Sequence, residues 1–238
     1  MRVAPAVLVL LALLTLSGCE TTAEKSAELE RTRHRARHVE QGLTIARPST
    51  VVHVVSATLV HGGEGNAAAI ALRNDSARTL RSVPIAITVT DARGNTVFQN
   101  NAPGLERALT QISSLPAHGS LTWVNDQIPS GGAPASITAT VGQAPTASGP
   151  EPRIEVEGPH PGEEASDEVT GSVRNRSGVT QEKLVVYVIA RRGGRIVAAG
   201  RAVLPEAAAG ASAPFHAFLV GDPAGAQLQA SVPATAFG

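Results

Sequence analysis

The sequence predicts an all-β protein with two tandem β-sandwich domains, and three observations lead to this prediction. From Val51 onward, short runs rich in Val, Ile and Thr alternate with polar residues at the period of two that is typical of strands. The 23 glycines and 16 prolines supply turns between such strands. The strand pattern also occurs twice, on either side of a stretch with the composition of a linker.

The N-terminal residues 1–18 predict a signal for export. Arg2 provides a positive start, and Val3 to Leu16 is an apolar run that falls short of the roughly 20 residues of a membrane-spanning helix. The segment Leu16-Ser17-Gly18-Cys19 resembles the lipobox of bacterial lipoproteins. This resemblance implies a signal peptide that is cleaved before Cys19, and a thiol of Cys19 that carries a diacylglyceryl group with fatty acids such as palmitate.

The lipid on Cys19 defines the expected location and the first expected partner. We expect an extracytoplasmic protein that is lipid-anchored to the cell membrane or outer membrane, because two or more buried acyl chains give stable attachment. Cys19 is the only cysteine, so no disulfide within the chain is available. Site residues of the other kinds (catalytic, cofactor-binding and metal) are predicted to be none.

Residues 19–50 are predicted to be the lipid anchor and a polar, partly helical stalk, which ends around Gly42 and Pro48. His34 and His38 are spaced to share a metal on a helix, but the flanking arginines would repel a cation, so no metal is expected. The arginine cluster at 31, 33, 35 and 37 could contact anionic lipid, although a solvated charged face is the favoured interpretation.

The rest of the chain divides into domain 1 at residues 51–142, a linker at residues 143–151 and domain 2 at residues 152–238. The strands predicted in domain 1 are His53–Val60, Ala67–Arg73, Pro84–Thr90, Asn95–Gln99, Leu121–Asn125 and Ser136–Val141. Those predicted in domain 2 are Arg153–Glu157, Val169–Asn175, Leu184–Ala190, Ile196–Ala202, Pro214–Val220 and Gln227–Val232.

The two domains share motifs, which indicates a tandem repeat. An Arg-Asn-x-Ser motif ends a strand at Asn74 and again at Asn175, 101 positions later. Its Asn and Ser side chains are expected to bond nearby backbone and fix a bend, an interpretation favoured over glycosylation. An apolar strand and a glycine turn follow each motif, and then comes a Leu-Pro pair, at 115–116 in the first copy and at 204–205 in the second.

This order of motifs resembles the FxLYD-type and related small immunoglobulin-like domains of bacterial surface proteins. The segment Asp91 to Gly94 carries the acid and glycine of that pattern, whereas the second copy has Arg191 in place of the acid. The resemblance implies an immunoglobulin-like β-sandwich and a surface location, and it implies no reaction.

No catalytic constellation is visible in the sequence. The seven histidines are scattered, and no Gly-x-Ser-x-Gly elbow occurs. The Gly-rich run from His61 to Gly65 predicts a hairpin turn, and Trp123 is expected in a core. The acidic group Glu163, Glu164, Asp167 and Glu168 is assigned to a solvated loop in preference to a calcium site. Zero net charge and few aromatics argue against nucleic acid as a partner.

The leading hypothesis is therefore a membrane-anchored extracytoplasmic lipoprotein that acts as a non-enzymatic binding or envelope-interaction module, with no cofactor. Its partner would be an unidentified envelope protein or polymer. The alternative is an accessory or solute-binding subunit of an envelope transport system. A pocket between the domains near residues 144–161 would favour the alternative, and exposed edge strands on a convex surface would favour the leading hypothesis.

Overall fold

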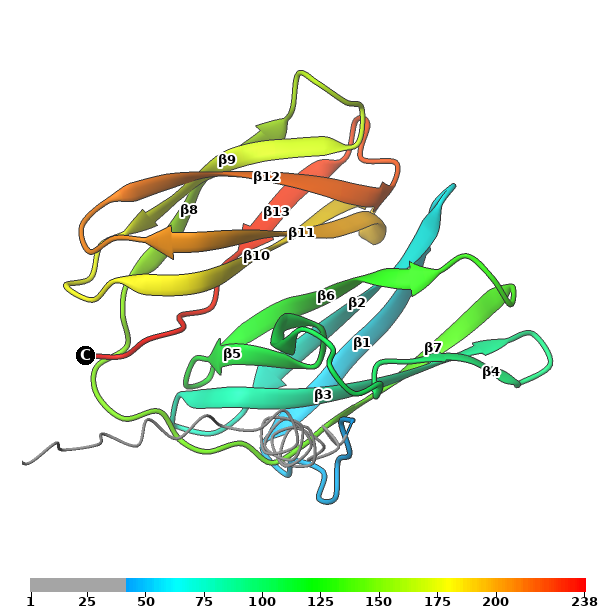
Figure 1. The fold of residues 1–238 in the computed structure, drawn as a ribbon, viewed down its shortest axis with the longest axis horizontal. Coiled ribbons are helices and arrows are strands. Elements are labelled where there is room, and N and C mark those ends of the chain that lie inside the picture. The colour runs from blue at the N-terminus through cyan, green and yellow to red at the C-terminus, as the bar shows by residue number, and fades with distance from the viewer. Residues whose placement is uncertain (1–41) are drawn as a thin grey trace, which may run out of the picture. The chain divides into compact units, whose positions relative to one another are not determined.

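The computed structural model describes residues 42–238 (Figure 1). Residues Gln41–Gly238 form one compact unit. Cys19, the predicted signal peptide and the histidine pair at 34 and 38 lie outside the described residues. Within residues 42–238 the chain is all-β apart from one turn of 3-10 helix, and no helix there is long and apolar enough to cross a bilayer.

The first half of the unit contains seven strands in two antiparallel sheets. They are β1 (Val52–His61), β2 (Gly65–Asn74), β3 (Leu80–Asp91), β4 (Thr96–Gln99), β5 (Gln111–Leu115), β6 (Ser120–Pro129) and β7 (Pro134–Val141), with the 3-10 turn η1 (Arg107–Leu109) before β5. One sheet has the order β1-β2-β6. The other has the order β4-β3-β5, and β7 also pairs with β3. The six strands predicted in this half are present, and β5 was not predicted.

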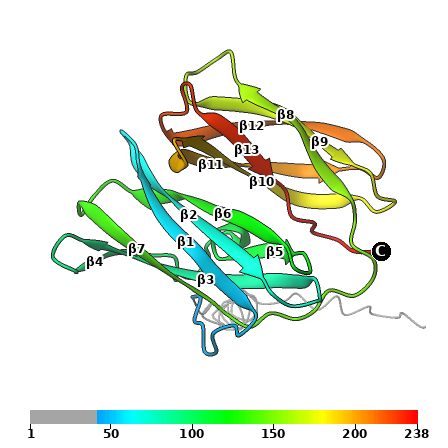
Figure 2. The same ribbon diagram turned by 180° about the vertical axis from the view of Figure 1, so that it is seen from behind.

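The second half is one antiparallel sheet of six strands. These are β8 (Ile154–Pro161), β9 (Glu168–Asn175), β10 (Gln181–Arg192), β11 (Arg195–Ala207), β12 (Ser212–Gly221) and β13 (Gln227–Ser231). Their order is β13-β10-β11-β12-β9-β8. The sheet curls so that β13 comes close to β8, as the view from behind shows (Figure 2). All six strands predicted for this half are present.

The two halves have the same strand order, because β7, β3, β6, β2 and β1 correspond to β13, β10, β12, β9 and β8. They differ in the middle. In the second half, β11 runs without a break and pairs with both β10 and β12. In the first half, the equivalent stretch is split into β4 and β5 by residues 100–110, and β5 and β6 are not paired. This insertion is the main difference between the two halves.

The repeated asparagines hold the same turn in each half. Asn74 Nδ2 donates to the carbonyl oxygens of Arg78 and Pro116, both at 2.8 Å, while its Oδ1 accepts from the Ser76 hydroxyl at 2.7 Å. Asn175 Nδ2 donates to Val179 and Ala207, both at 2.9 Å, and its Oδ1 accepts from the Ser177 hydroxyl at 2.7 Å. The predicted bend is confirmed.

These bonds also correct one detail of the repeat. The backbone N–H of Asn74 donates to Gly119, and that of Asn175 donates to Ala211. With this register, Pro116 corresponds to Ala208, whose carbonyl also accepts from Asn175. The Leu-Pro pair at 204–205 lies three residues too early to match 115–116. The expected equivalence of the two Leu-Pro pairs is therefore wrong. The two pairs match in residue type but not in their distance from the hydrogen-bonded turn.

Each half has a buried core, and the central strands differ in how they contribute. On β3, Val83, Ile85, Ile87 and Val89 are buried, whereas the residues between them are partly exposed, so one face of the strand packs inward. On β10, every residue from Leu184 to Ala190 is buried. Leu184, Val186 and Val188 belong to the core of the second half, whereas Val185, Tyr187 and Ile189 pack with the core of the first half.

Two segments predicted as connecting chain contribute to the first half. Residues 42–50, the described end of the predicted stalk, contain no helix, and Pro48 forms a bridge with Gly142. In the predicted linker, Pro145 accepts from the Arg81 N–H and Ala147 donates to the Thr79 carbonyl. Residues 145–147 therefore extend the sheet beside the start of β3. The division into domains at residues 142 and 152 stays a prediction.

Candidate binding cleft

The two halves are docked along a junction formed by the outer face of β2 and β6 and by β10, β11 and β12. Small residues permit the close approach. A methyl group added at Gly221 would lie 2.9 Å from a methyl carbon of Val60, and one added at Gly62 would lie 2.8 Å from Val220. On β2, Ala67 and Ala69 are fully buried although they alternate with the core-facing residues Ala68 and Ile70. The strand is therefore covered on both faces.

Arg201 is the charged residue at the centre of this junction. It lies on β11 with 6 % of its side chain exposed, and it bonds two carboxylates of the first half. Its Nε is 2.9 Å from Asp126 Oδ1 on β6, and its Nη1 is 3.0 Å from Glu106 Oε2 in the insertion. Burial alone would lower the pKa of Arg201, but these two ion pairs raise it above the ordinary value. The guanidinium thus links the halves as a permanent cation.

A cleft of about 650 Å³ opens at one end of the junction. It is lined by Arg81, Ser82, Glu106, Arg107, Ala108, Gln111, Ser113, Ser148, Glu182, Lys183, Val185, Tyr187, Thr235, Ala236 and Phe237. Both halves contribute, together with Ser148 from the predicted linker. In Figures 1 and 2 the starts of β3 and β10 lie on the same side of the unit, beside the C-terminal segment.

The repeat places equivalent residues on the two sides of the cleft. Ser82 and Lys183 are 101 positions apart, and each immediately precedes the central apolar run of its strand. Both adopt left-handed backbone conformations, with φ of 50° and 51°. Such conformations are uncommon outside glycine, and they are found most often where structure serves a function. Both exposed polar side chains line the same cleft.

The insertion in the first half supplies one wall. Asn100 is buried and replaces missing strand partners of β3, because its Oδ1 accepts from the Ile87 N–H and its Nδ2 donates to Ile85, both at 2.8 Å. The same Nδ2 donates to the Leu109 carbonyl at 2.8 Å and so secures η1. Because η1 is fixed in this way, the preceding Glu106 faces Arg201 and the neighbouring Arg107 lines the cleft.

The C-terminal segment forms another wall and is held by a buried glutamine. Gln181 Oε1 accepts from the backbone N–H groups of Thr235 and Ala236, at 2.8 and 3.0 Å. Its Nε2 donates to the Ala236 carbonyl at 3.0 Å. On the other side, the Ser113 hydroxyl donates to Pro233 at 3.4 Å. Residues 233–237 are therefore attached to both halves.

The floor of the cleft is apolar and the rim is charged. Ala108, Val185 and Tyr187 are buried, and burial raises the pKa of the Tyr187 phenol, so this group stays neutral. Trp123 lies directly behind the floor, because its Nε1 donates to the Ala108 carbonyl at 2.9 Å. Its burial confirms the predicted core position. The charged residues Arg81, Arg107, Glu182 and Lys183 are exposed at the rim.

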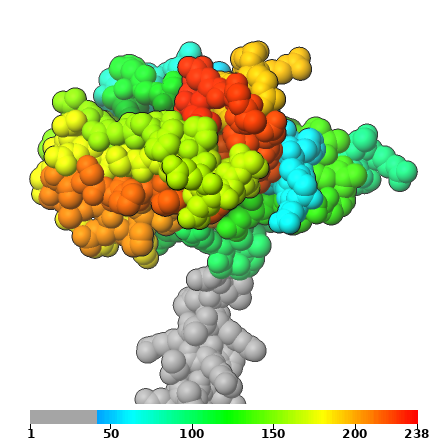
Figure 3. Space-filling view, turned by 90° about the horizontal axis from the view of Figure 1, so that it is seen from above, coloured from blue at the N-terminus to red at the C-terminus, as the bar shows by residue number. Residues whose placement is uncertain are grey.

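A second, smaller groove of about 350 Å³ lies elsewhere on the junction, and Tyr187 borders it as well. Val55 and Leu121 form one side, and Ile189 and Ala230 form the other. The space-filling view shows β1 in cyan beside the red β13 at this place (Figure 3). This groove has one charged residue, Arg191, in its lining.

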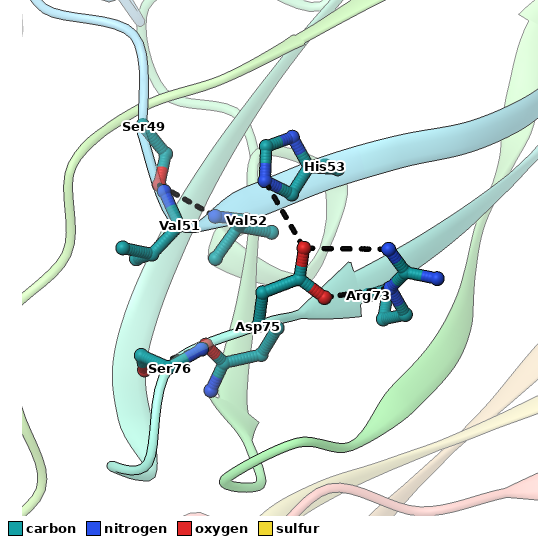
Figure 4. A network of polar contacts seen from close by, with 8 residues as sticks. Ser49, Val51, Val52, His53, Arg73, Asp75 and Ser76 are labelled. Atoms are coloured by element: carbon teal, nitrogen blue, oxygen red, sulfur yellow. Dashed lines mark hydrogen bonds and ion pairs between the residues drawn. The ribbon is translucent and has the colours of Figure 1, made fainter.

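A polar cluster around Asp75 brings a histidine, an aspartate and two serines into one region of the first half (Figure 4). Asp75 accepts from Arg73 Nε at 2.6 Å and lies 3.3 Å from His53 Nε2, and the bond from Arg73 lowers the pKa of the carboxyl. The nearby serines are engaged elsewhere. Ser49 Oγ accepts from backbone N–H groups of residues 51 and 52, and Ser76 bonds Asn74.

The same place in the second half carries a related cluster with the charges exchanged. There Glu155 on β8 is bonded by the Nε atoms of Arg153 and Arg176. In both halves the cluster ties the edge strand to the asparagine turn. A structural role accounts for both clusters, since neither brings a nucleophile to a base.

The acidic group predicted as a solvated loop needs one correction. Glu168 is buried, with 1 % of its side chain exposed, and its Oε1 lies 2.8 Å from Nδ1 of the exposed His216. Its other oxygen accepts from the Glu164 N–H at 3.1 Å. The bond from His216, followed by that from Glu164, lowers the pKa of Glu168. In residues 42–238 no group of three or more His, Cys, Asp or Glu side chains could hold a metal ion.

The cleft residues were not predicted from the sequence. Arg81, Arg107 and Lys183 stand in no motif, and their convergence depends on docking of the halves. Arg201 offered a weak signal, since it is a charge inside the predicted strand Ile196–Ala202. The unequal loop lengths of the two copies were a second signal, because the insertion carries Glu106 and Arg107.

Comparison with known proteins adds little to this description. No known family profile matches the sequence, and no curated protein matches it. Among solved structures, red sea bream transglutaminase is similar over 90 % of this chain and 32 % of that chain, with 12 % identity and a TM-score of 0.24. The chain thus spans about a third of that protein. Similarity at this TM-score carries no argument for or against a shared fold or activity.

Proposed function

We propose that this chain is a lipid-anchored extracytoplasmic binding protein of the cell envelope. In this proposal, lipid on Cys19 holds a polar stalk that displays two docked immunoglobulin-like β-sandwich domains, and the ligand occupies the junction cleft. The lipobox at Leu16–Cys19 supports the anchor. The common strand order and the matching networks of Asn74 and Asn175 support two copies of one domain.

The junction cleft is the observation that carries the binding role. It combines an apolar floor with convergent polar and charged groups at the rim, as ligand sites usually do. Its walls are fixed by Arg201, Asn100 and Gln181, so the site is formed before a ligand arrives.

The alternative function, a solute-binding or accessory subunit of an envelope transport system, is favoured by the place of the cleft. It lies between the two halves and includes Ser148 from the predicted linker. That is the position expected for a site that captures a small solute. The size of the bound species separates the two functions, because a module that contacts an envelope protein or polymer would capture a large partner.

Photo-crosslinking in the native host tests this proposal. A photoreactive residue is placed at Gln111 in the cleft of the full-length chain, and at Thr138, which is exposed on β7, as a matched control. We expect a membrane-associated adduct at Gln111 that is absent at Thr138. A small added mass would favour the solute-binding role, and a protein or polymer adduct would favour the envelope-interaction role. Equal labelling at both positions, or none at Gln111, would contradict a ligand in the cleft.

A further inference from the structure

We propose that the junction cleft binds an amphiphilic anion, that is, a molecule with a phosphate or carboxylate head and an aliphatic or aromatic body. This inference rests on the proposed binding function and specifies the class of ligand. It follows from the charges at the rim, the apolar surface of the floor and the strained backbone that presents one of the cations.

The rim carries an excess of positive charge. Arg81, Arg107 and Lys183 line the cleft, and none of them forms an ion pair with a carboxylate among residues 42–238. Of the two acids in the lining, Glu106 is engaged by Arg201 at 3.0 Å. Glu182 is the one acid left to oppose the three cations. Charged groups that converge without a partner favour a ligand of the opposite sign.

The apolar floor of the cleft is complementary to an apolar part of a ligand. Ala108, Val185 and Tyr187 form it, with Phe237 at the side. Tyr187 stays neutral because burial raises its pKa, so the floor carries no negative charge against an anion. Burial of aliphatic or aromatic ligand groups against this surface is favourable because it removes apolar area from water. A small inorganic anion would leave this surface in contact with water.

Lys183 has an unusual backbone conformation at the rim of the cleft. Its left-handed conformation is unfavourable for a lysine, and the equivalent Ser82 has the same conformation across the opening. Asparagine adopts this conformation more readily than most residues. A Lys183→Asn variant therefore removes the charge without disturbing the backbone, and it separates a binding role of the ammonium group from a structural one.

The test uses residues 41–238, which form a compact unit containing both cores, so no acyl chain competes for the cleft. Decyl phosphate below its micelle concentration is titrated and followed by calorimetry and by the fluorescence of Trp123, the only tryptophan, behind the floor. Inorganic phosphate supplies the head alone, decanol supplies the body alone, and decyltrimethylammonium supplies the body with the opposite charge.

We expect decyl phosphate to bind at least tenfold more tightly than each of the other three probes. Lys183→Asn combined with Arg107→Gln should weaken decyl phosphate binding about tenfold or more and leave decyltrimethylammonium binding unchanged. Arg93→Gln combined with Arg195→Gln removes two exposed arginines outside the cleft and should have no effect.

Three outcomes would overturn the inference. Equal affinity for decyl phosphate and inorganic phosphate would show that the apolar floor does not contribute to binding. Unchanged affinity for decyl phosphate in the rim variant would show that the cations of the rim do not contribute. Failure of decyl phosphate to bind, together with a specific adduct at Gln111 in the host, would refute the ligand class while the binding function stands. Absence of that adduct as well would refute both.

Discussion

Asn74 and Asn175 make the same set of side-chain hydrogen bonds at positions 101 residues apart, each to three backbone carbonyls and to one serine two residues later. Both side chains are fully buried. The turn between the second and third strands of each half depends on this residue, because its side-chain amide bonds backbone carbonyls of two separate segments at once.

We expect Asn74→Ala and Asn175→Ala each to destabilise the protein by about 3 kcal/mol or more, because several buried polar groups lose their partners at once. Asp75→Ala is the matched control in the same turn. It removes an exposed ion pair and should cost much less stability. Denaturant unfolding measures all three, and equal losses for Asn74→Ala and Asp75→Ala would show that burial of the asparagine is unimportant.

The central strands should differ in their tolerance of charge. Val89→Asp on β3 places an unpaired charge in the core and should cost several kcal/mol, whereas Thr88→Asp on the half-exposed face should cost much less. On β10 both faces are buried, so Tyr187→Asp should be as damaging as Val188→Asp. Thermal unfolding of the four variants checks this. Tolerance of Tyr187→Asp would mean that the junction does not form in solution.

The ion pairs of Arg201 should matter more than those at the surface. Arg201→Leu leaves Asp126 and Glu106 facing an apolar side chain without their cation, so it should destabilise the protein more than loss of an exposed pair does. We expect this variant to become sensitive to proteolysis between residues 148 and 153, whereas the wild-type unit stays in one piece. Arg192→Leu breaks the exposed pair with Asp222 and should leave the digestion pattern unchanged.

The pair of Glu168 and His216 predicts a dependence of stability on pH. The pKa of Glu168 in the folded protein is below its ordinary value of 4.5, so the stability that it contributes is present above pH 4.5 and is lost as the pH falls through the folded pKa. His216→Ala should therefore be less stable than the wild type near neutral pH, and the difference should shrink in acid. His160→Ala, which loses bonds to Gly158 and Thr170 but none to a carboxylate, is the control and should not show this shrinking difference below pH 4.5.

The sequence was sufficient to predict the strands, but it was insufficient to predict the residues of the candidate site. Period-two patterns predicted twelve of the thirteen strands, because half-buried strands such as β3 alternate visibly. The missing strand, β5, contains Gln111 and two serines, so its sequence lacks the apolar alternation of the others, and it pairs with the start of β3. The continuous apolar run of β10 was consistent with burial on one face or on both, and only the docking partner decides between these.

The cleft depends on contacts between segments far apart in the chain, and no local pattern encodes such contacts. Arg107 reaches it through an insertion that the second copy lacks, and Thr235 reaches it through Gln181. The asparagine motif, by contrast, was predictable because its partners are mostly within a few residues. Local sequence patterns were thus enough to predict the strands and the asparagine turns, whereas the candidate site depends on tertiary contacts.

Labelling of the anchor tests the proposed function most directly. The full-length chain is expressed in its host with a palmitate analogue, and detergent phase separation is performed alongside. We predict that the wild type carries the label and enters the detergent phase, and that Cys19→Ala does neither. Ser17→Ala, which keeps a small residue in the lipobox, should behave as the wild type. A Cys19→Ala protein that still carries the label, or a wild type that carries none, would contradict the account of a lipid-anchored envelope protein.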